Sequence, residues 1–88
     1  MVRLNRAVAV AEADGPHVGL AMLEGVEKLM DDSHRFYAVK ADLERRAGHT
    51  SHAIESYNRA IELCTNEVEG SFLRNRLLEV ETAIDEIA

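Results

Sequence analysis

The sequence of 88 residues is poor in cysteine, proline, glycine and aromatic residues. Its one cysteine cannot form a disulfide within the chain, which fits the reducing cytoplasm, and we expect a cytoplasmic protein. One proline and five glycines argue against a disordered or low-complexity chain. Aromatic residues make up 5% of the sequence and hydrophobic residues 47%, so we expect an aliphatic, alanine-rich core.

Basic residues are also in the minority. Ten lysines and arginines stand against sixteen aspartates and glutamates, a formal net charge of −6. A broad basic surface is therefore not expected, and we expect no direct DNA binding.

No apolar run approaches the roughly 20 residues of a membrane-spanning helix, so we expect no membrane contact. A chain of this length can bury one core, which predicts a single domain over residues 1–88.

The stretch from Gly48 to Cys64 has the clearest helical pattern. Its apolar residues fall on one stripe of an α-helix, and they are Ala53, Ile54, Tyr57, Ala60, Ile61 and Cys64. Gly48 can end a preceding helix in the left-handed conformation, and Thr50 or Ser51 can cap the next. The small side chains of Ala53 and Ala60 predict a close contact with a neighbouring helix.

Four further helices are predicted from the same kind of pattern, over residues 2–13, 16 to about 30, 34–47 and from 67 onwards. Gly15 and Pro16 separate the first two. Asp31, Asp32 and Ser33 supply caps for the third, and Asn66 with Glu69 has the spacing of a capping box at the fifth. No stretch alternates apolar and polar residues over the length of a strand. The sequence therefore predicts an all-α fold of five helices.

A shift of 34 residues brings the packing positions of two helix pairs into register. Small residues fall on small ones and large on large: Ala7 on Ala41, Gly19 on Ala53, Leu20 on Ile54, Leu23 on Tyr57, and Val26 on Ala60. This is the period of the tetratricopeptide unit, so we predict two tetratricopeptide-like helical hairpins and a C-terminal capping helix. Lys40 and Glu44 depart from the pattern, because a leucine and an aromatic residue usually stand there.

The last helix carries a narrower apolar seam than the others. Its residues are spaced 4, 3, 4 and 3 apart, and they are Leu73, Leu77, Val80, Ile84 and Ile87. We expect Phe72, Leu73 and Leu77 to cover the fourth helix. Since the seam runs on past the small body, we also expect a homodimer through the last helix, with Leu77, Val80, Ile84 and Ile87 in its interface. The alternative is that the seam packs on an upstream domain of a longer polypeptide.

Few residues of the chain indicate catalysis or metal binding. His49, His52 and Glu55 could ligate zinc, but His49 falls in a turn and His52 in the first helical turn, so surface histidines are the preferred interpretation. Cys64 ends an apolar stripe without a local base, which favours a buried structural thiol. The chain also lacks a glycine-rich phosphate loop and a nucleophile elbow. We therefore expect no enzyme, no metal site and no cofactor.

Polar residues on the first helix of each pair are candidates for protein binding, because these helices line the concave surface of stacked hairpins. The candidates are Asn5, Arg6, Tyr37, Lys40 and Glu44. The alternative is that Asn5 bonds to a neighbouring turn and that Arg6 pairs with an acid.

Three separated segments of the chain form a recognisable set. They are Leu4–Ala9 continuing through Glu12–Pro16, then Ala41–Leu43 with Arg46 and Gly48, and then Asn66–Glu67 with Phe72, Leu73 and Arg76. Together they resemble the C-terminal extension of a group of extracytoplasmic-function sigma factors of bacterial RNA polymerase. The likeness covers about residues 2–78, and residues 81–88 extend beyond it as a tail.

The resemblance implies a tetratricopeptide-like domain that follows two DNA- and polymerase-binding sigma domains and regulates the sigma factor through protein contacts. We therefore expect a C-terminal piece of a longer sigma factor that docks on its own sigma domains or on RNA polymerase and modulates transcription initiation. No catalytic residues carry over. The alternative, from a different class, is a small-molecule sensor with its ligand between the hairpins, although the alanine-rich faces favour the first interpretation.

Overall fold

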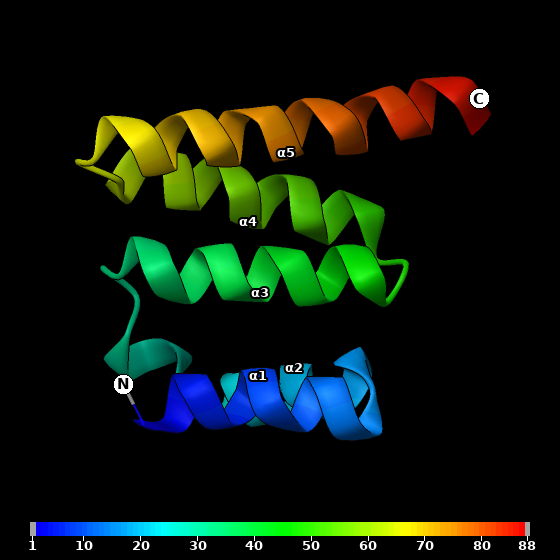
Figure 1. Ribbon diagram of the computed structural model, residues 1–88. Helices are drawn as coiled ribbons and strands as arrows, with labels where there is room; N and C mark the ends of the chain where they lie inside the picture. The colour runs from blue at the N-terminus through cyan, green and yellow to red at the C-terminus, as the bar shows by residue number, and fades with distance from the viewer. Residues whose placement is uncertain (1, 88) are drawn as a thin grey trace.

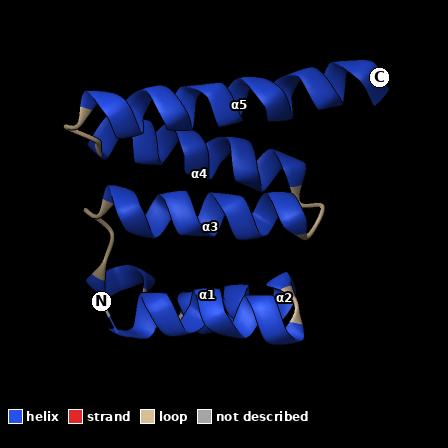
Figure 2. Ribbon diagram, in the orientation of Figure 1, coloured by secondary structure: helices blue, strands red, loops and turns tan. Residues whose placement is uncertain are grey.

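The computed structural model describes residues 2–87, with side chains from residue 4 to residue 83. Over that range the chain is helical and contains no strand, so the prediction of an all-α fold with five helices is confirmed (Figure 2). The elements are α1 (Val2–Asp14), α2 (Pro16–Glu24), the short 3-10 helix η1 (Glu27–Leu29), α3 (His34–Arg46), α4 (Thr50–Leu63) and α5 (Glu67–Ile87).

Successive helices run antiparallel, and short turns join them (Figure 1). The closest pairs are α1 with α2 and α3 with α4, while α5 lies along α4 on the far side from α1 and α2. The link from α2 through η1 to α3 joins the first pair to the second. Each pair is thus a helical hairpin, and the assignment of these hairpins to the tetratricopeptide class stays a prediction.

Two glycines make the tight turns between paired helices. Gly15 has φ 103° and Gly48 has φ 85°, in the region that side chains with a Cβ rarely occupy. Pro16 follows Gly15 as one of the first residues of α2, where its missing N–H leaves no bond unmade. Both turns therefore form as the sequence predicted.

Helix capping was predicted correctly at two of three positions. Ser33 Oγ accepts from Phe36 N at 3.2 Å, and Asn66 Oδ1 accepts from the backbone N–H groups of Val68 and Glu69 at 2.9 and 3.1 Å. The expected cap by Thr50 or Ser51 is wrong, because His49 holds the N-cap position of α4 and makes no side-chain cap bond. One left-handed residue, Gly48, reverses the chain so tightly that Thr50 already lies within the helix.

The second helix is shorter than predicted. It ends at Glu24 rather than near Met30, and the chain continues past Gly25 into η1. Glycine is a poor helix former, and bonds of the tighter 3-10 type take over, such as Leu29 N to Val26 O at 3.0 Å. Val26 remains 6% exposed, so the change of helix type keeps its side chain in the core.

Two apolar clusters form the core, and the residues matched by the 34-residue shift are distributed between them. The cluster of the first hairpin contains Leu4, Ala7, Ala11, Leu23, Val26, Phe36 and Leu43. The cluster of the second contains Ala41, Ala53, Tyr57, Ala60, Leu73 and Val80. Tyr37 packs against both clusters and connects them. Ala53 and Ala60 are fully buried, as expected for a close helix contact.

Helix α5 turns most of its described seam towards the body. Leu73 and Val80 are buried, and Leu77 packs partly buried against the cluster of the second hairpin. Phe72 is 57% exposed, so the expectation that it covers the fourth helix is wrong. Phe72 lies beside the buried seam of α5 and not within it. The side chains of Ile84 and Ile87 lie outside the described residues.

Candidate functional site

A hollow region of the surface crosses α3 between α2 and α4. It consists of two adjoining hollows of about 340 and 310 Å³, which share Lys40, Glu44 and His52. The first hollow continues along α4, and the second reaches α2 and the turn between α3 and α4. We call the two together the α3 groove. Besides the shared residues its lining includes Tyr37, Ser56 and Arg59 in the first hollow and His17, Leu20 and His49 in the second.

A buried carboxylate lies in the floor of the α3 groove. Glu44 is only 5% exposed, and its Oε1 accepts a hydrogen bond of 2.6 Å from the hydroxyl of Ser56, itself 5% exposed. Lys40 Nζ lies 3.9 Å from Glu44 Oε2 and 3.4 Å from Glu27 Oε1. A buried carboxylate without partners would be strongly destabilising, so Ser56 and Lys40 are what allow the Glu44 carboxylate to be buried.

Tyr37 lies at the other end of the groove between two cations. Lys40 Nζ is 5.9 Å and the Arg59 guanidinium carbon 5.8 Å from the centre of its ring. Both distances are within the range of cation–π attraction. Arg59 also donates to the carbonyl of Asp31 at 3.4 Å, which ties α4 to the link before α3. The groove therefore offers an aromatic surface flanked by positive charge beside a buried negative charge.

The structure brings together three of the five candidates for protein binding. Tyr37, Lys40 and Glu44 line the α3 groove, whereas Asn5 and Arg6 are exposed on α1, which does not contribute to either hollow. The residues that α4 contributes were missed by the sequence analysis. Their spacing could have indicated a shared surface, because His52, Ser56 and Arg59 are separated by four and three residues and therefore lie on one helix face.

Three histidines lie together at one end of the groove. The ring centres of His17 and His49 are 5.3 Å apart, and those of His49 and His52 are 6.2 Å apart, both in edge-to-face arrangement. His17 comes from α2 and was not associated with the other two in the sequence. Glu55, considered with them as a zinc ligand, lines the neighbouring hollow.

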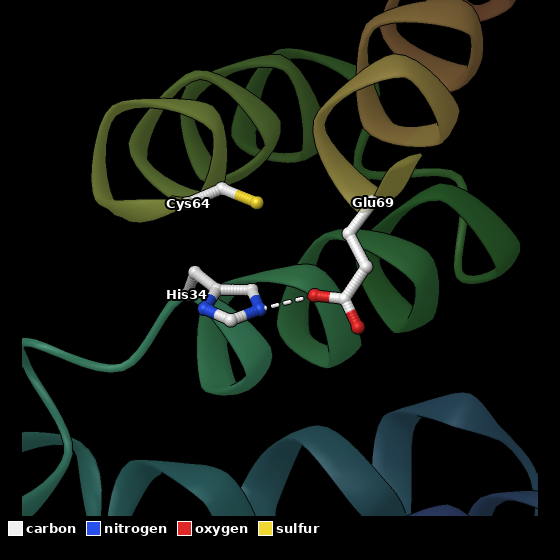
Figure 3. Close-up of side chains that lie close together, drawn as sticks. All are labelled: His34, Cys64 and Glu69. Carbon is white, nitrogen blue, oxygen red and sulfur yellow. Dashed lines mark hydrogen bonds and ion pairs between the residues drawn. The ribbon is translucent and has the colours of Figure 1, made fainter. Parts of the chain in front are cut away.

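A different set of side chains has the arrangement of metal ligands. Within the described residues, His34, Cys64 and Glu69 form the one group of three whose ligand atoms all lie within 4.8 Å of one another (Figure 3). His34 Nε2 is 2.5 Å from Glu69 Oε2, and Cys64 Sγ is 3.3 Å from the carbonyl oxygen of Asn66. Cys64 is partly exposed and has a histidine beside it, so the prediction of a buried thiol without a neighbouring base is wrong.

The sequence analysis missed this cluster because its residues come from three different helix ends. His34 is the first residue of α3, Cys64 follows the last residue of α4, and Glu69 lies in the first turn of α5. Only the antiparallel packing of these helices brings the start of α3 beside the turn between α4 and α5. The one local signal was Glu69 at the capping-box position, and in the structure its carboxylate contacts His34.

Away from the groove, two neighbouring side chains, Tyr57 and Arg45, have shifted pKa values. Burial raises the pKa of Tyr57, and the neighbouring Arg45 guanidinium partly offsets that rise. The hydrogen bond of 2.6 Å between Arg45 and Asp42 raises the pKa of Arg45. Tyr57 is 2% exposed and packs in the same apolar cluster as Ala41, so its side chain supports the packing of α3 on α4.

The chain is similar to a bacterial protein of unassigned function. The chain is 34% identical over 77 residues to an uncharacterized protein of Rhizobium meliloti (strain 1021), a match that covers 88% of this chain and 18% of the relative. The chain thus spans less than a fifth of the length of that relative. No protein-family model matches the sequence, and no solved structure matches it. Within the described residues no helix is both long and apolar enough to cross a membrane.

Proposed function

We propose that this chain is a regulatory protein-interaction domain of a longer bacterial sigma factor and that it acts through the α3 groove. The occupant is an extended segment of the sigma domains in the same polypeptide or of RNA polymerase. The observation that carries the proposal is the groove itself, in which three successive helices place an aromatic ring, two cations and a partnered buried carboxylate along one surface. The resemblance of the sequence to sigma-factor extensions supplies the biological context.

The charges of the groove favour a peptide over a nucleic acid. Glu44 and Glu55 lie among the groove cations, and the whole chain carries a net charge of −6, so the phosphates of DNA would meet repulsion. A peptide segment offers both hydrogen-bond donors for Glu44 and an acidic side chain for the cations that flank Tyr37. The uncharacterized relative carries the matching region in less than a fifth of its length, as expected for one module among several.

The test is in vitro transcription with the full-length polypeptide that carries this domain. Introducing negative charge at two exposed groove positions, His52→Glu with Arg59→Glu, should reproduce part of the effect of deleting the domain. The matched control is Asn5→Glu with Lys28→Glu, which makes the same change of net charge at two exposed residues outside the groove lining. Equal effects of both double variants would contradict the groove, and unchanged transcription after deletion would overturn the function.

Direct DNA binding is tested with the isolated domain. A gel shift with promoter DNA should show no complex at physiological salt, because the domain lacks a net positive charge. A salt-sensitive shift by the domain alone would contradict this part of the proposal.

A small-molecule sensor is the second candidate function. The two hollows of about 340 and 310 Å³ fall within the size range of small-molecule sites, which favours it. A thermal-shift screen against metabolites separates the two functions, since a ligand that binds only the folded state raises the melting midpoint. A metabolite that raises the midpoint of the parent but not of the His52→Glu, Arg59→Glu variant would favour the sensor.

A further inference from the structure

We propose that His34, Cys64 and Glu69 form a binding site for a divalent transition metal, and that zinc is the ion that fits it best. An imidazole nitrogen, a thiolate sulfur and a carboxylate oxygen are the three ligand types that zinc takes in proteins. The site is independent of the α3 groove and shares no residue with its lining.

The positions of the ligand atoms are close to those that a tetrahedral ion requires. Zinc bonds of about 2.0–2.3 Å place neighbouring ligand atoms about 3.3–3.6 Å apart. In the structure His34 Nε2 and Glu69 Oε2 are 2.5 Å apart, and all three ligand atoms lie within 4.8 Å of one another. Side-chain movements of about 1 Å, with the carboxylate moving away from the imidazole and the sulfur moving closer, therefore produce the coordination geometry.

Without metal, a hydrogen bond holds the His34 imidazole close to the Glu69 carboxylate. In a metal site the ion takes the place of that proton between nitrogen and oxygen. The thiol of Cys64 likewise gives up the proton that it donates to the carbonyl of Asn66 at 3.3 Å. The thiolate and the carboxylate together then balance the two positive charges of the ion.

The backbone fixes each ligand at the end of a helix. Ser33 caps α3 directly before His34, Asn66 caps α5 three residues before Glu69, and Cys64 directly follows the last residue of α4. The three ligands converge on one point from these three helix ends, as Figure 3 shows. The side chains of His34 and Glu69 are 33% and 55% exposed, so the fourth position of the ion is open to water.

Metal binding would have a mechanical consequence for the fold. Helix α5 packs mainly along α4, and the ion would replace the His34–Glu69 hydrogen bond between α5 and the start of α3 with metal–ligand bonds. These bonds would join the last helix to both helices of the second hairpin. We therefore expect zinc to stabilise the folded chain, because an ion that binds the native state and not the unfolded one raises the melting midpoint.

The three histidines His17, His49 and His52 are the competing site for an added metal. Their ring centres are 5.3 and 6.2 Å apart, and they provide no thiolate. The sulfur ligand therefore separates the two sites, because only coordination by Cys64 gives a thiolate-to-metal charge-transfer absorption. The pair of substitutions His49→Gln with His52→Gln serves as the matched control.

The experiment is a titration of the reduced, metal-free chain with Co²⁺, followed by displacement with Zn²⁺. We expect the visible bands of a tetrahedral cobalt site together with a thiolate charge-transfer band, both of which zinc removes. Cys64→Ser should abolish the charge-transfer band, and His34→Gln or Glu69→Gln should weaken binding at least tenfold, while the His49→Gln, His52→Gln control binds like the parent.

Three results would overturn the site: no cobalt spectrum with the parent chain, a charge-transfer band that survives Cys64→Ser, or loss of the spectrum in the histidine control. Circular dichroism of each variant checks that it is folded. As a second readout, zinc should raise the melting midpoint of the parent and of the histidine control, and it should leave that of Cys64→Ser unchanged.

Discussion

Glu44 on α3 and Ser56 on α4 share a hydrogen bond of 2.6 Å, and both residues are only 5% exposed. This buried hydrogen bond links α3 to α4, the two helices of the second hairpin. It lies in the floor of the α3 groove, so the same pair bears on stability and on the proposed binding surface.

Replacing Ser56 with alanine should therefore destabilise the fold. The change removes a hydrogen-bond donor from a buried carboxylate, which costs about 1–3 kcal/mol when the acceptor stays buried. Urea unfolding of Ser56→Ala measures the loss. The control is Ser71→Ala, at an exposed serine of α5, which should stay within about 0.5 kcal/mol of the parent. Equal stability of the two variants would show that the Glu44 bond is not needed.

Gly19 is expected to be intolerant of even one methyl group. A Cβ at this position would lie 2.9 Å from Ala11 Cβ and 2.9 Å from the carbonyl oxygen of Ala7, which is backbone and cannot rotate away. Gly19→Ala should therefore cost about 1–3 kcal/mol, as other overpacked contacts do. The matched control is Gly25→Ala, whose Cβ would be 3.7 Å from its nearest neighbour at a φ of −72°.

The control variant Gly25→Ala should not lose stability as Gly19→Ala does. Gly25→Ala fits the native backbone and restricts the unfolded chain, so we expect it to be neutral or to stabilise by about 0.4–1 kcal/mol. Thermal and urea melts of both variants provide the comparison. A Gly19→Ala protein as stable as the parent would show that α1 and α2 are not held at this close distance.

Fewer residues of the α5 seam are available for the predicted homodimer than the sequence suggested. Val80 is 4% exposed and Leu77 packs partly buried within the chain, so these two support the fold before any interface. Ile84→Glu should weaken a dimer in sedimentation equilibrium and leave the helix content unchanged. A monomer at all concentrations of the parent chain would remove the homodimer from consideration.

The buried Tyr57 should make stability depend on alkaline pH. Its pKa is raised above the ordinary value of 10.0, so the unfolded state loses its phenolic proton at a lower pH than the folded state does. The stabilisation is complete below pH 10 and is lost as the pH rises through the folded-state pKa. Chemical denaturation between pH 8 and about pH 11 should show this decline in the parent and a smaller decline in Tyr57→Phe. Identical slopes would contradict the assignment.

Much of the fold was decided by local sequence. The apolar stripe from Ala53 to Ile61 predicted α4, and Gly15 and Gly48 predicted the two tight turns, because helical periodicity and left-handed backbone depend on neighbouring residues only. Local rules failed at Thr50 and beyond Gly25. At both places a tight turn or a 3-10 segment satisfied the backbone in a way that residue preferences alone do not distinguish from a regular helix.

The two candidate sites also differ in how much of each could be predicted from local sequence. Lys40 and Glu44 are one helical turn apart, so the sequence by itself placed them on one surface, while Ser56 and Arg59 joined them only when α4 packed on α3. The metal-ligand cluster was settled by tertiary structure alone. His34 and Glu69 are 35 residues apart, and nothing near either residue indicates the other. They meet, with Cys64 beside them, because the antiparallel order of α3, α4 and α5 brings the start of one helix to the end of the next, and that order depends on the packing of the core.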